Sequence, residues 1–217
     1  MKVVQFKSAG VEGFLHQPEN NRSGRGLLLT HGAGSNCNAP LLVGVAAAFS
    51  DAGVAVLRCN LPFRQRRASG PPSPSTAAAD REGLRSAAAA LRGIVSGEVF
   101  LGGHSYGGRQ SSILAADEPE IAAALLLLSY PLHPPGKPTE LRTQHFPRLR
   151  MPAIFVHGTE DPFGSIAELQ ACIATIPART QIITVEKAGH ELTKGRFELT
   201  VIVSALLDAA GRSLSEM

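Results

Sequence analysis

The chain has 217 residues, of which 44% are hydrophobic and 18% charged, and these values predict one folded domain over residues 1–217. A formal net charge of +3 is too small for a nucleic-acid-binding protein without a concentrated basic patch, so no nucleic-acid partner is expected. Residues 1–7 do not lead into the apolar core of a signal peptide, and no stretch reaches the ~18 apolar residues of a membrane span. We therefore expect a cytoplasmic protein without a membrane partner. The three scattered cysteines argue against a disulfide framework or a zinc site.

Short apolar runs alternate with longer amphipathic or Ala-rich segments along the chain. Two runs, 3–7 and 11–15, predict an N-terminal hairpin. The pattern then predicts, in chain order, strand 26–30, helix 40–51, strand 54–58, helix 75–95, strand 98–102, helix 106–116, strands 122–128 and 152–157, helix 164–175, strand 180–185 and helix 197–210. Alternating βα units predict an α/β fold, with a mostly parallel twisted sheet and helices on both faces. In such sheets, ligands bind beyond the carboxyl ends of the strands.

The most informative motif is Gly103-His104-Ser105-Tyr106-Gly107, which lies between a predicted strand and a predicted helix. Glycine at its first and last positions permits a sharp turn, because a larger side chain would collide with neighbouring backbone. The spacing alone is weak evidence and is compatible with a structural serine, but a strand–turn–helix context is typical of a nucleophilic serine. We interpret Ser105 as a catalytic nucleophile.

A serine hydroxyl needs a base, and the base needs a group that orients it. For a serine on such a turn, the acid comes next in the chain and the histidine last. Asp161 follows strand 152–157 and His190 follows strand 180–185, so we predict that they are the acid and the base. Glu160 is an alternative acid, Asp161 could instead cap the next helix, and His190 could be a surface histidine.

Four other histidines are assigned no part in this chemistry. His31, His133 and His157 also lie at strand ends, but they stand in the wrong chain order for the base. We expect His157 to pack beneath the acid loop, His31 to support the loop after strand 26–30, and His104 to pack against the neighbouring sheet or helix.

An oxyanion needs backbone donors beside the nucleophile. The N–H of Tyr106, directly after Ser105, is one predicted donor. The second is the N–H of Ala33 in the small-residue loop after strand 26–30, with Gly32 or Gly34 as alternatives if the register differs.

Two basic clusters follow predicted strands. Arg58, Arg64, Arg66 and Arg67 follow strand 54–58, and Lys137, Arg142, Arg148 and Arg150 follow strand 122–128. Such clusters are usually solvated loop faces, but here they could form a cationic rim that attracts an anionic substrate. The candidate substrate-binding residues are Arg64, Arg67, His133, Lys137 and Arg142.

Four segments resemble a known family: Thr30-His31-Gly32-Ala33-Gly34, Arg58-Cys59-Asn60-Leu61-Pro62-Phe63, Tyr130-Pro131-Leu132-His133-Pro134-Pro135-Gly136-Lys137-Pro138, and Gly158-Thr159-Glu160-Asp161-Pro162-Phe163-Gly164. Over nearly its full length the chain resembles the α/β-hydrolases, and most of all their small cap-less, dienelactone-hydrolase-like branch. Within it, the chain is similar to a subgroup of bacterial predicted hydrolases and testis-expressed hydrolase-like proteins. The resemblance implies the α/β-hydrolase fold and a nucleophile at Ser105, but no particular substrate, because some members act as scaffolds. Many relatives have Lys-Ser-Met where this chain has His104-Ser105-Tyr106.

Many α/β-hydrolases carry a helical cap after the sixth strand, whereas this chain has only the segment 131–151 there. We therefore predict no cap domain and an open site suited to small or polar substrates. The sequence predicts a serine hydrolase that cleaves carboxylic esters through an acyl-enzyme and needs no metal or organic cofactor. A thioesterase, lactonase or peptidase would use the same groups, and a non-catalytic interaction module is the alternative from another class. The oligomeric state is left open.

Overall fold

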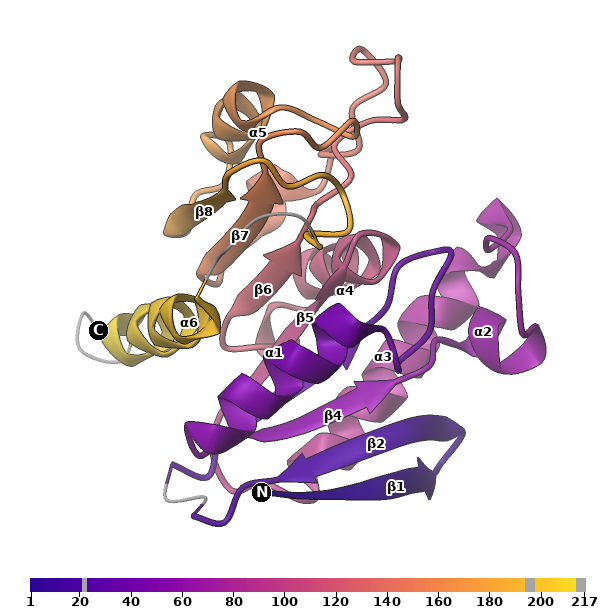
Figure 1. Ribbon diagram of the computed structural model, residues 1–217, viewed down its shortest axis with the longest axis vertical. Coiled ribbons are helices and arrows are strands. Elements are labelled where there is room, and N and C mark those ends of the chain that lie inside the picture. The colour runs from indigo at the N-terminus through magenta and orange to yellow at the C-terminus, as the bar shows by residue number, and fades with distance from the viewer. Residues whose placement is uncertain (21–22, 194–197, 214–217) are drawn as a thin grey trace.

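The computed structural model describes residues 1–20, 23–193 and 198–213. Within these ranges, eight strands form a sheet in the order β1-β2-β4-β3-β5-β6-β7-β8 (Figure 1). The strands are β1 (Lys2–Ser8), β2 (Val11–Gln17), β3 (Gly26–Thr30), β4 (Ala55–Cys59), β5 (Val99–His104), β6 (Leu125–Leu128), β7 (Ala153–Gly158) and β8 (Thr180–Val185). β1 and β2 are antiparallel to their neighbours. The other six strands, β3 to β8, are parallel to one another. The predicted N-terminal hairpin and the mostly parallel sheet are confirmed.

Helices cover both faces of the sheet, as expected. α1 (Pro40–Asp51) and α6 (Leu199–Ser213) lie in front of it in Figure 1, and α3 (Ala77–Arg92) and α4 (Tyr106–Asp117) lie behind it. Alternate strand residues face the two layers: Leu27 and Leu29 of β3 belong to the core under α1 and α6, and Leu28 belongs to the core under α3 and α4. Because every residue of β3 is buried, its apolar run is continuous rather than alternating.

Several boundaries differ from the sequence prediction. Residues 62–66, expected in a loop, form the short helix α2 (Pro62–Arg66), which Pro62 begins. β6 is shorter than 122–128, because a 3₁₀ turn at Pro119–Ile121 delays the start of the ladder. A 3₁₀ turn at Pro74–Thr76 precedes α3, and α5 (Ile166–Ile173) begins only after its capping-box residue Ser165. The predicted start of the last helix, residue 197, lies outside the described residues.

The carboxyl edge of the sheet carries no cap domain. Residues 129–152, between β6 and β7, are all described, and the one helical element among them is a 3₁₀ turn at Phe146–Arg148. The prediction of an uncapped fold is therefore confirmed. Among the described helices, none has the length and apolar character required to cross a membrane.

Candidate active site

Ser105 occupies a strained turn between β5 and α4. Its φ of 49° and ψ of −114° lie in a region that non-glycine residues rarely adopt, at a cost of about 1–3 kcal/mol. A Cβ on Gly103 would lie 2.6 Å from the Thr30 carbonyl oxygen, and one on Gly107 would lie 2.6 Å from the His31 carbonyl oxygen. The two glycines therefore let the turn pack against the end of β3. The Ser105 N–H donates to the Leu128 carbonyl at 2.8 Å, which fixes the turn to β6.

Ser105, His190 and Asp161 form a continuous hydrogen-bonded chain. The Oγ of Ser105 lies 2.8 Å from Nε2 of His190. Nδ1 of His190 lies 3.0 Å and 2.9 Å from the two carboxylate oxygens of Asp161, whose side chain is fully buried. The Phe163 N–H also donates to the carboxylate of Asp161, at 2.9 Å. Glu160 is exposed, so of the two candidate acids it is Asp161 that lies against His190.

Backbone contacts between the loops after β7 and β8 bring Asp161 and His190 together. The N–H of Thr159 donates to the Val185 carbonyl at 3.1 Å, and the N–H of Glu160 donates to the Ala188 carbonyl at 2.9 Å. The N–H of Lys187 donates to Oγ1 of Thr159 at 2.9 Å. Because β7 and β8 are parallel neighbours, both loops leave the same edge of the sheet.

Two aromatic rings position His190. Nε2 of His104 donates to the main-chain carbonyl of His190 at 2.8 Å, and burial lowers the pKa of His104. The ring of Phe163 packs on the ring of His190, with centroids 4.2 Å apart and planes inclined at 32°. His104 thus contacts the loop that carries His190, whereas the sequence predicted packing against the neighbouring sheet or helix.

The other histidines at strand ends have internal partners. His157 is fully buried, and its Nε2 donates to the Gly164 carbonyl at 2.7 Å, beneath the loop of Asp161. His31 donates from Nδ1 to the Gly32 carbonyl and accepts the Leu61 N–H at Nε2. Burial lowers the pKa of His31 to about 4, so the ring is neutral at pH 7. Both positions agree with the sequence interpretation.

Ala33 and Tyr106 border the same cavity as Ser105. Neither backbone N–H donates to another group in the described part of the chain. The Tyr106 hydroxyl donates to Oδ2 of Asp80 at 2.8 Å, and Oδ1 of Asp80 accepts the Phe63 N–H at 2.9 Å. Burial and the bond to Asp80 raise the pKa of Tyr106, which keeps the phenol protonated. Asp80 is fully buried in α3, and nothing in the sequence around it indicated a place beside the site.

The cavity has a volume of about 480 Å³. Ser105 and Tyr106 line it together with four prolines and two arginines. The prolines are Pro71, Pro72, Pro74 and Pro131, and the arginines are Arg109 and Arg142. Among the described residues, no three His, Cys, Asp or Glu side chains are grouped so that they could hold a metal ion.

Most members of the predicted cationic rim do not line the cavity. Arg64 is buried and donates to four backbone carbonyls, those of Ala33, Ser35, Arg67 and Gly70, so it joins two loops instead of facing a ligand. Arg67 is exposed and is not among the residues that line the cavity.

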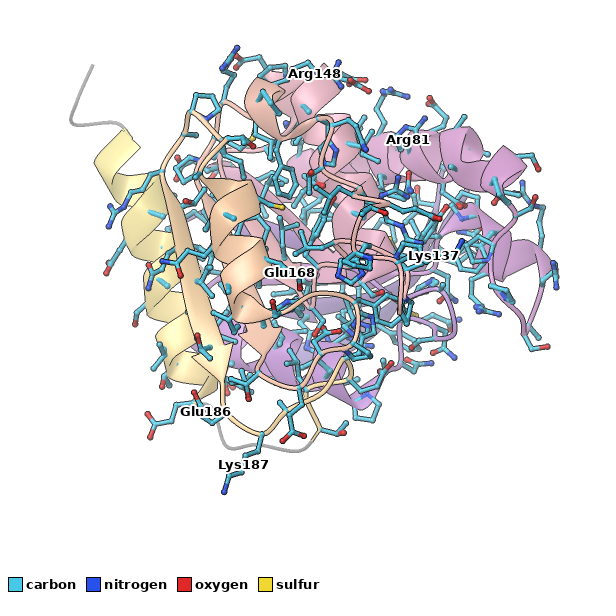
Figure 2. All side chains as sticks on the ribbon, turned by 90° about the horizontal axis from the view of Figure 1, so that it is seen from above. Arg81, Lys137, Arg148, Glu168, Glu186 and Lys187 are labelled. Carbon is cyan, nitrogen blue, oxygen red and sulfur yellow. The ribbon has the colours of Figure 1, made fainter. Side chains whose placement is uncertain are left out.

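The second basic cluster is also dispersed. Lys137 is exposed and pairs with Glu140 at 2.9 Å, and Arg148 pairs with Asp117 at 3.0 Å in a different part of the surface (Figure 2). His133 is buried, with its Nε2 3.6 Å from Glu168.

Of the five candidate substrate-binding residues, Arg142 alone lines the cavity, and Arg109, which the sequence interpretation missed, joins it. One signal could have found Arg109: it follows Ser105 by four residues at the start of a helix, which places the two on one side of it.

Known proteins share this architecture. A dienelactone hydrolase from Anabaena variabilis superposes with a TM-score of 0.72 at 20% identity, over 97% of this chain and 96% of that chain. Est1E from Butyrivibrio proteoclasticus, in its form with bound ferulic acid, has a TM-score of 0.75 at 16% identity, over 98% of this chain and 100% of that chain. An α/β serine hydrolase without a lid from Xanthomonas campestris has a TM-score of 0.71 at 16% identity, over 98% of this chain and 94% of that chain.

At these identities the structural likeness shows the fold. Family membership is shown by the sequence itself, because residues 23–212 match the model of an alpha/beta hydrolase domain. With its eight-stranded sheet, its uncapped carboxyl edge and this match over most of its length, the chain belongs to the alpha/beta hydrolase domain family and resembles the cap-less, dienelactone-hydrolase-like serine hydrolases.

Proposed function

We propose that this protein, acting as one domain over residues 1–217, is a serine hydrolase that cleaves carboxylic esters through an acyl-enzyme. The observation that carries the proposal is the hydrogen-bonded chain from Asp161 through His190 to Ser105, which ends at a serine in a strained turn that borders a cavity.

In the first half of the proposed reaction, the carboxylate of Asp161 holds the proton of His190 on Nδ1, which leaves Nε2 free to accept. Oγ of Ser105 attacks the ester carbonyl carbon while its proton passes to Nε2. The backbone N–H groups of Tyr106 and Ala33 donate to the oxyanion that develops, and each such donor is typically worth ~100- to 1,000-fold in kcat. The tetrahedral intermediate then collapses, His190 gives its proton to the departing alkoxide oxygen, and the alcohol leaves.

In the second half, His190 takes a proton from a water molecule as that water attacks the acyl-enzyme. Breakdown of the second tetrahedral intermediate breaks the bond to Oγ of Ser105, which recovers a proton from His190, and the carboxylic acid leaves. Every proton transfer in this cycle uses Nε2 of His190, and the cycle consumes one water per ester.

The shape of the cavity supports small substrates. With about 480 Å³ of space and walls of rigid proline, it suits a short or aromatic group better than a long acyl chain. The bound ferulic acid of Est1E and the lactone chemistry in the name of the Anabaena enzyme support an ester or lactone substrate of that size. A steep rise in activity from acetyl to palmitoyl 4-nitrophenyl esters would contradict this part of the proposal.

The first prediction concerns the nucleophile. Ser105→Ala removes the atom that attacks, so kcat for a 4-nitrophenyl ester is expected to fall about a million-fold if the three residues act as a unit. A fluorophosphonate probe should label the wild type and not this variant. A folded wild type that resists the probe would favour the non-catalytic interaction module, and a variant that keeps most of its activity would refute Ser105 as nucleophile.

A further inference from the structure

One wall of the Ser105 cavity is cationic. Arg109 lies in the first turn of α4, one helical turn after the nucleophile, and its N–H donates to the Ser105 carbonyl at 2.9 Å. Arg142 comes from the segment between β6 and β7 and lines the same cavity. Both side chains are partly buried. Two segments 33 residues apart in the sequence (142 − 109) therefore place guanidinium groups beside the reacting serine.

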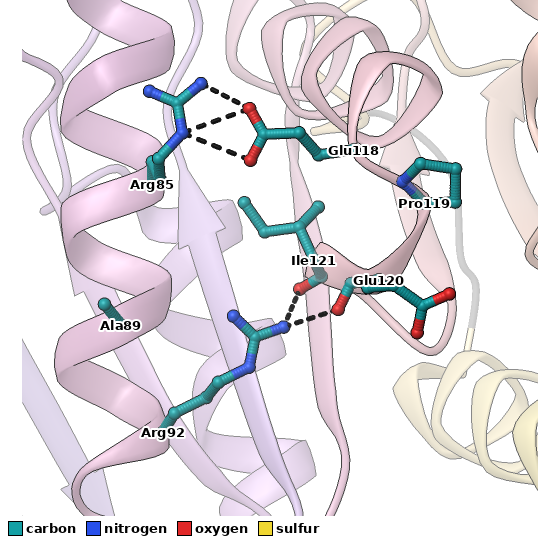
Figure 3. Close-up of a pocket in the computed structure, with 7 residues that line it drawn as sticks. All are labelled: Arg85, Ala89, Arg92, Glu118, Pro119, Glu120 and Ile121. Atoms are coloured by element: carbon teal, nitrogen blue, oxygen red, sulfur yellow. Dashed lines mark hydrogen bonds and ion pairs between the residues drawn. The ribbon is translucent and has the colours of Figure 1, made fainter.

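Neither guanidinium has an ionic partner in the described part of the chain: no carboxylate lies within 4.0 Å of Arg109 or Arg142. Nε of Arg109 is buried and has no hydrogen-bond partner among those residues. In a second hollow, between α3 and the turn after α4, the arginines do have partners. Arg85 pairs with Glu118, and Arg92 donates to two backbone carbonyls (Figure 3). Partly buried charges are normally paired, so the two free arginines in the Ser105 cavity require an explanation.

The one carboxylate whose charge acts on Arg142, that of Glu140, is exposed and pairs with Lys137 at 2.9 Å. His145, beside Arg109, has a pKa of about 4, lowered first by burial and then by the charge of Arg109, so it is neutral. Arg109 and Arg142 line one cavity, and burial, and after it the charge of Arg109, lowers the pKa of Arg142. The carboxylates that face the site have other partners: Asp161 contacts His190, and Asp80 contacts Tyr106.

Arg142 is held in place through its backbone. The hydroxyl of the fully buried Tyr130 donates to the Arg142 carbonyl at 2.7 Å, and the Arg142 N–H donates to the Leu132 carbonyl at 2.7 Å. The side chain thus extends from a fixed segment of main chain. Two guanidinium groups that border one cavity and have no carboxylate partner can hold a planar or tetrahedral oxyanion through several charge-assisted hydrogen bonds.

We propose that Arg109 and Arg142 bind an anionic oxygen group, a carboxylate or a phosphate, carried by the ester that Ser105 attacks. The uncharged part of the substrate lies between this pair and Ser105, against the proline walls. This inference rests on the proposed function and adds the substrate class: an ester whose acid or alcohol part carries a negative charge.

The test compares three aryl acetates: 4-acetoxybenzoate, 4-acetoxyphenyl phosphate and the neutral 4-acetoxybenzamide. Each kcat/KM is divided by the rate of hydroxide-catalysed hydrolysis of the same ester, which removes the difference in intrinsic reactivity. We expect the wild type to prefer at least one anionic ester over the amide, and Arg142→Gln to lower that preference by about 10- to 100-fold, the usual value of a charge-assisted hydrogen bond. Arg109→Gln should act in the same direction, and Arg142→Lys should recover part of the preference.

Arg92→Gln is the matched control, because it removes an arginine from the other hollow and should leave the preference unchanged. Thermal denaturation of each variant shows that it is folded. A preference for 4-acetoxybenzoate alone assigns a carboxylate, and one for 4-acetoxyphenyl phosphate alone assigns a phosphate. Equal normalised kcat/KM for all three esters, or a preference that survives in both Arg109→Gln and Arg142→Gln, would overturn the proposal.

A binding measurement separates this inference from the proposed function. Calorimetric titration of the Ser105→Ala protein with each anionic ester should give a Kd at least about tenfold lower than that of the Ser105→Ala/Arg142→Gln protein for the same ester. If the wild type hydrolyses no ester but this difference is found, the proposed function fails and the anion site stands. If hydrolysis is found without any difference in binding or selectivity, the anion site fails and the proposed function stands.

Discussion

Two hollows of this protein are lined by arginine and differ in what their arginines contact. The Ser105 cavity has a volume of about 480 Å³, and the hollow between α3 and the turn after α4 has about 430 Å³. In the second hollow, Nε of Arg85 lies 3.1 Å from both carboxylate oxygens of Glu118, and Nη2 of Arg92 donates to the Glu120 and Ile121 carbonyls at 2.8 Å and 2.6 Å (Figure 3). In the Ser105 cavity, Arg109 and Arg142 have no such partners in the described part of the chain.

The difference shows that neither the size of a hollow nor its number of arginines identifies a binding site. Arg85 and Arg92 use their donors to join α3 to the chain that follows α4, so an external anion would compete with internal partners. Arg109 and Arg142 keep their donors available and lie beside a serine that is hydrogen-bonded to a histidine. Free hydrogen-bonding capacity is therefore the physical property that separates the two regions.

The largest expected effect concerns the chemistry that only the Ser105 region contains. Asp161→Asn removes the carboxylate that holds the His190 tautomer, and kcat for a 4-nitrophenyl ester should fall about ten-thousand-fold with little change in KM. Glu160→Gln, the adjacent exposed carboxylate, is the matched control and should leave kcat within about twofold, a change too small to count as lost catalysis. A large loss in Glu160→Gln with near-normal activity in Asp161→Asn would reassign the acid.

A second substitution concerns Arg64, which has internal partners as Arg85 does. It tests whether such an arginine contributes to stability and not to substrate binding. Arg64→Met removes four hydrogen bonds, including those to the carbonyls of Ala33 and Ser35. We expect the free energy of unfolding to fall by about 2–4 kcal/mol, because partly buried carbonyls lose a charged partner.

The selectivity between 4-acetoxybenzoate and 4-acetoxybenzamide should not change in Arg64→Met. Arg67→Met, an exposed neighbour on the same segment, should alter the free energy of unfolding by no more than about 0.5 kcal/mol in urea denaturation. A loss of anion selectivity in Arg64→Met without a loss of stability would contradict the claim that arginines with internal partners stabilise the fold and do not bind the substrate.

The smallest expected effect is the dependence on salt. The unpaired charges of Arg109 and Arg142 should attract an anionic ester, so its kcat/KM is expected to fall roughly two- to fivefold between low and high ionic strength. The neutral amide should show almost no change. Arg142→Gln should reduce the salt dependence, whereas Arg85→Gln, in the hollow where charges are paired, should leave it as in the wild type. Equal salt dependence for the two esters would count against attraction by these arginines.

Much of the fold is predictable from the sequence, because each strand of the parallel sheet is a short apolar run that must be buried on both faces. The runs at β3 and β7 coincide with the observed strands within a residue or two. The element ends are less predictable. β6 is shorter than its apolar run, since that run also includes Ile121 and Ala122, which pack into the core before the ladder begins.

The sequence predicts the order Ser105, Asp161, His190 because each residue lies in the segment that follows a strand, and the carboxyl ends of parallel strands meet at one edge of a sheet. The sequence could not reveal which arginines are free. Arg64 and Arg67 look alike on one short segment, yet one is buried among carbonyls and the other is exposed. The partners of an arginine come from segments far along the chain, as Glu118 does for Arg85, and only the folded structure brings them within reach or leaves the guanidinium without them.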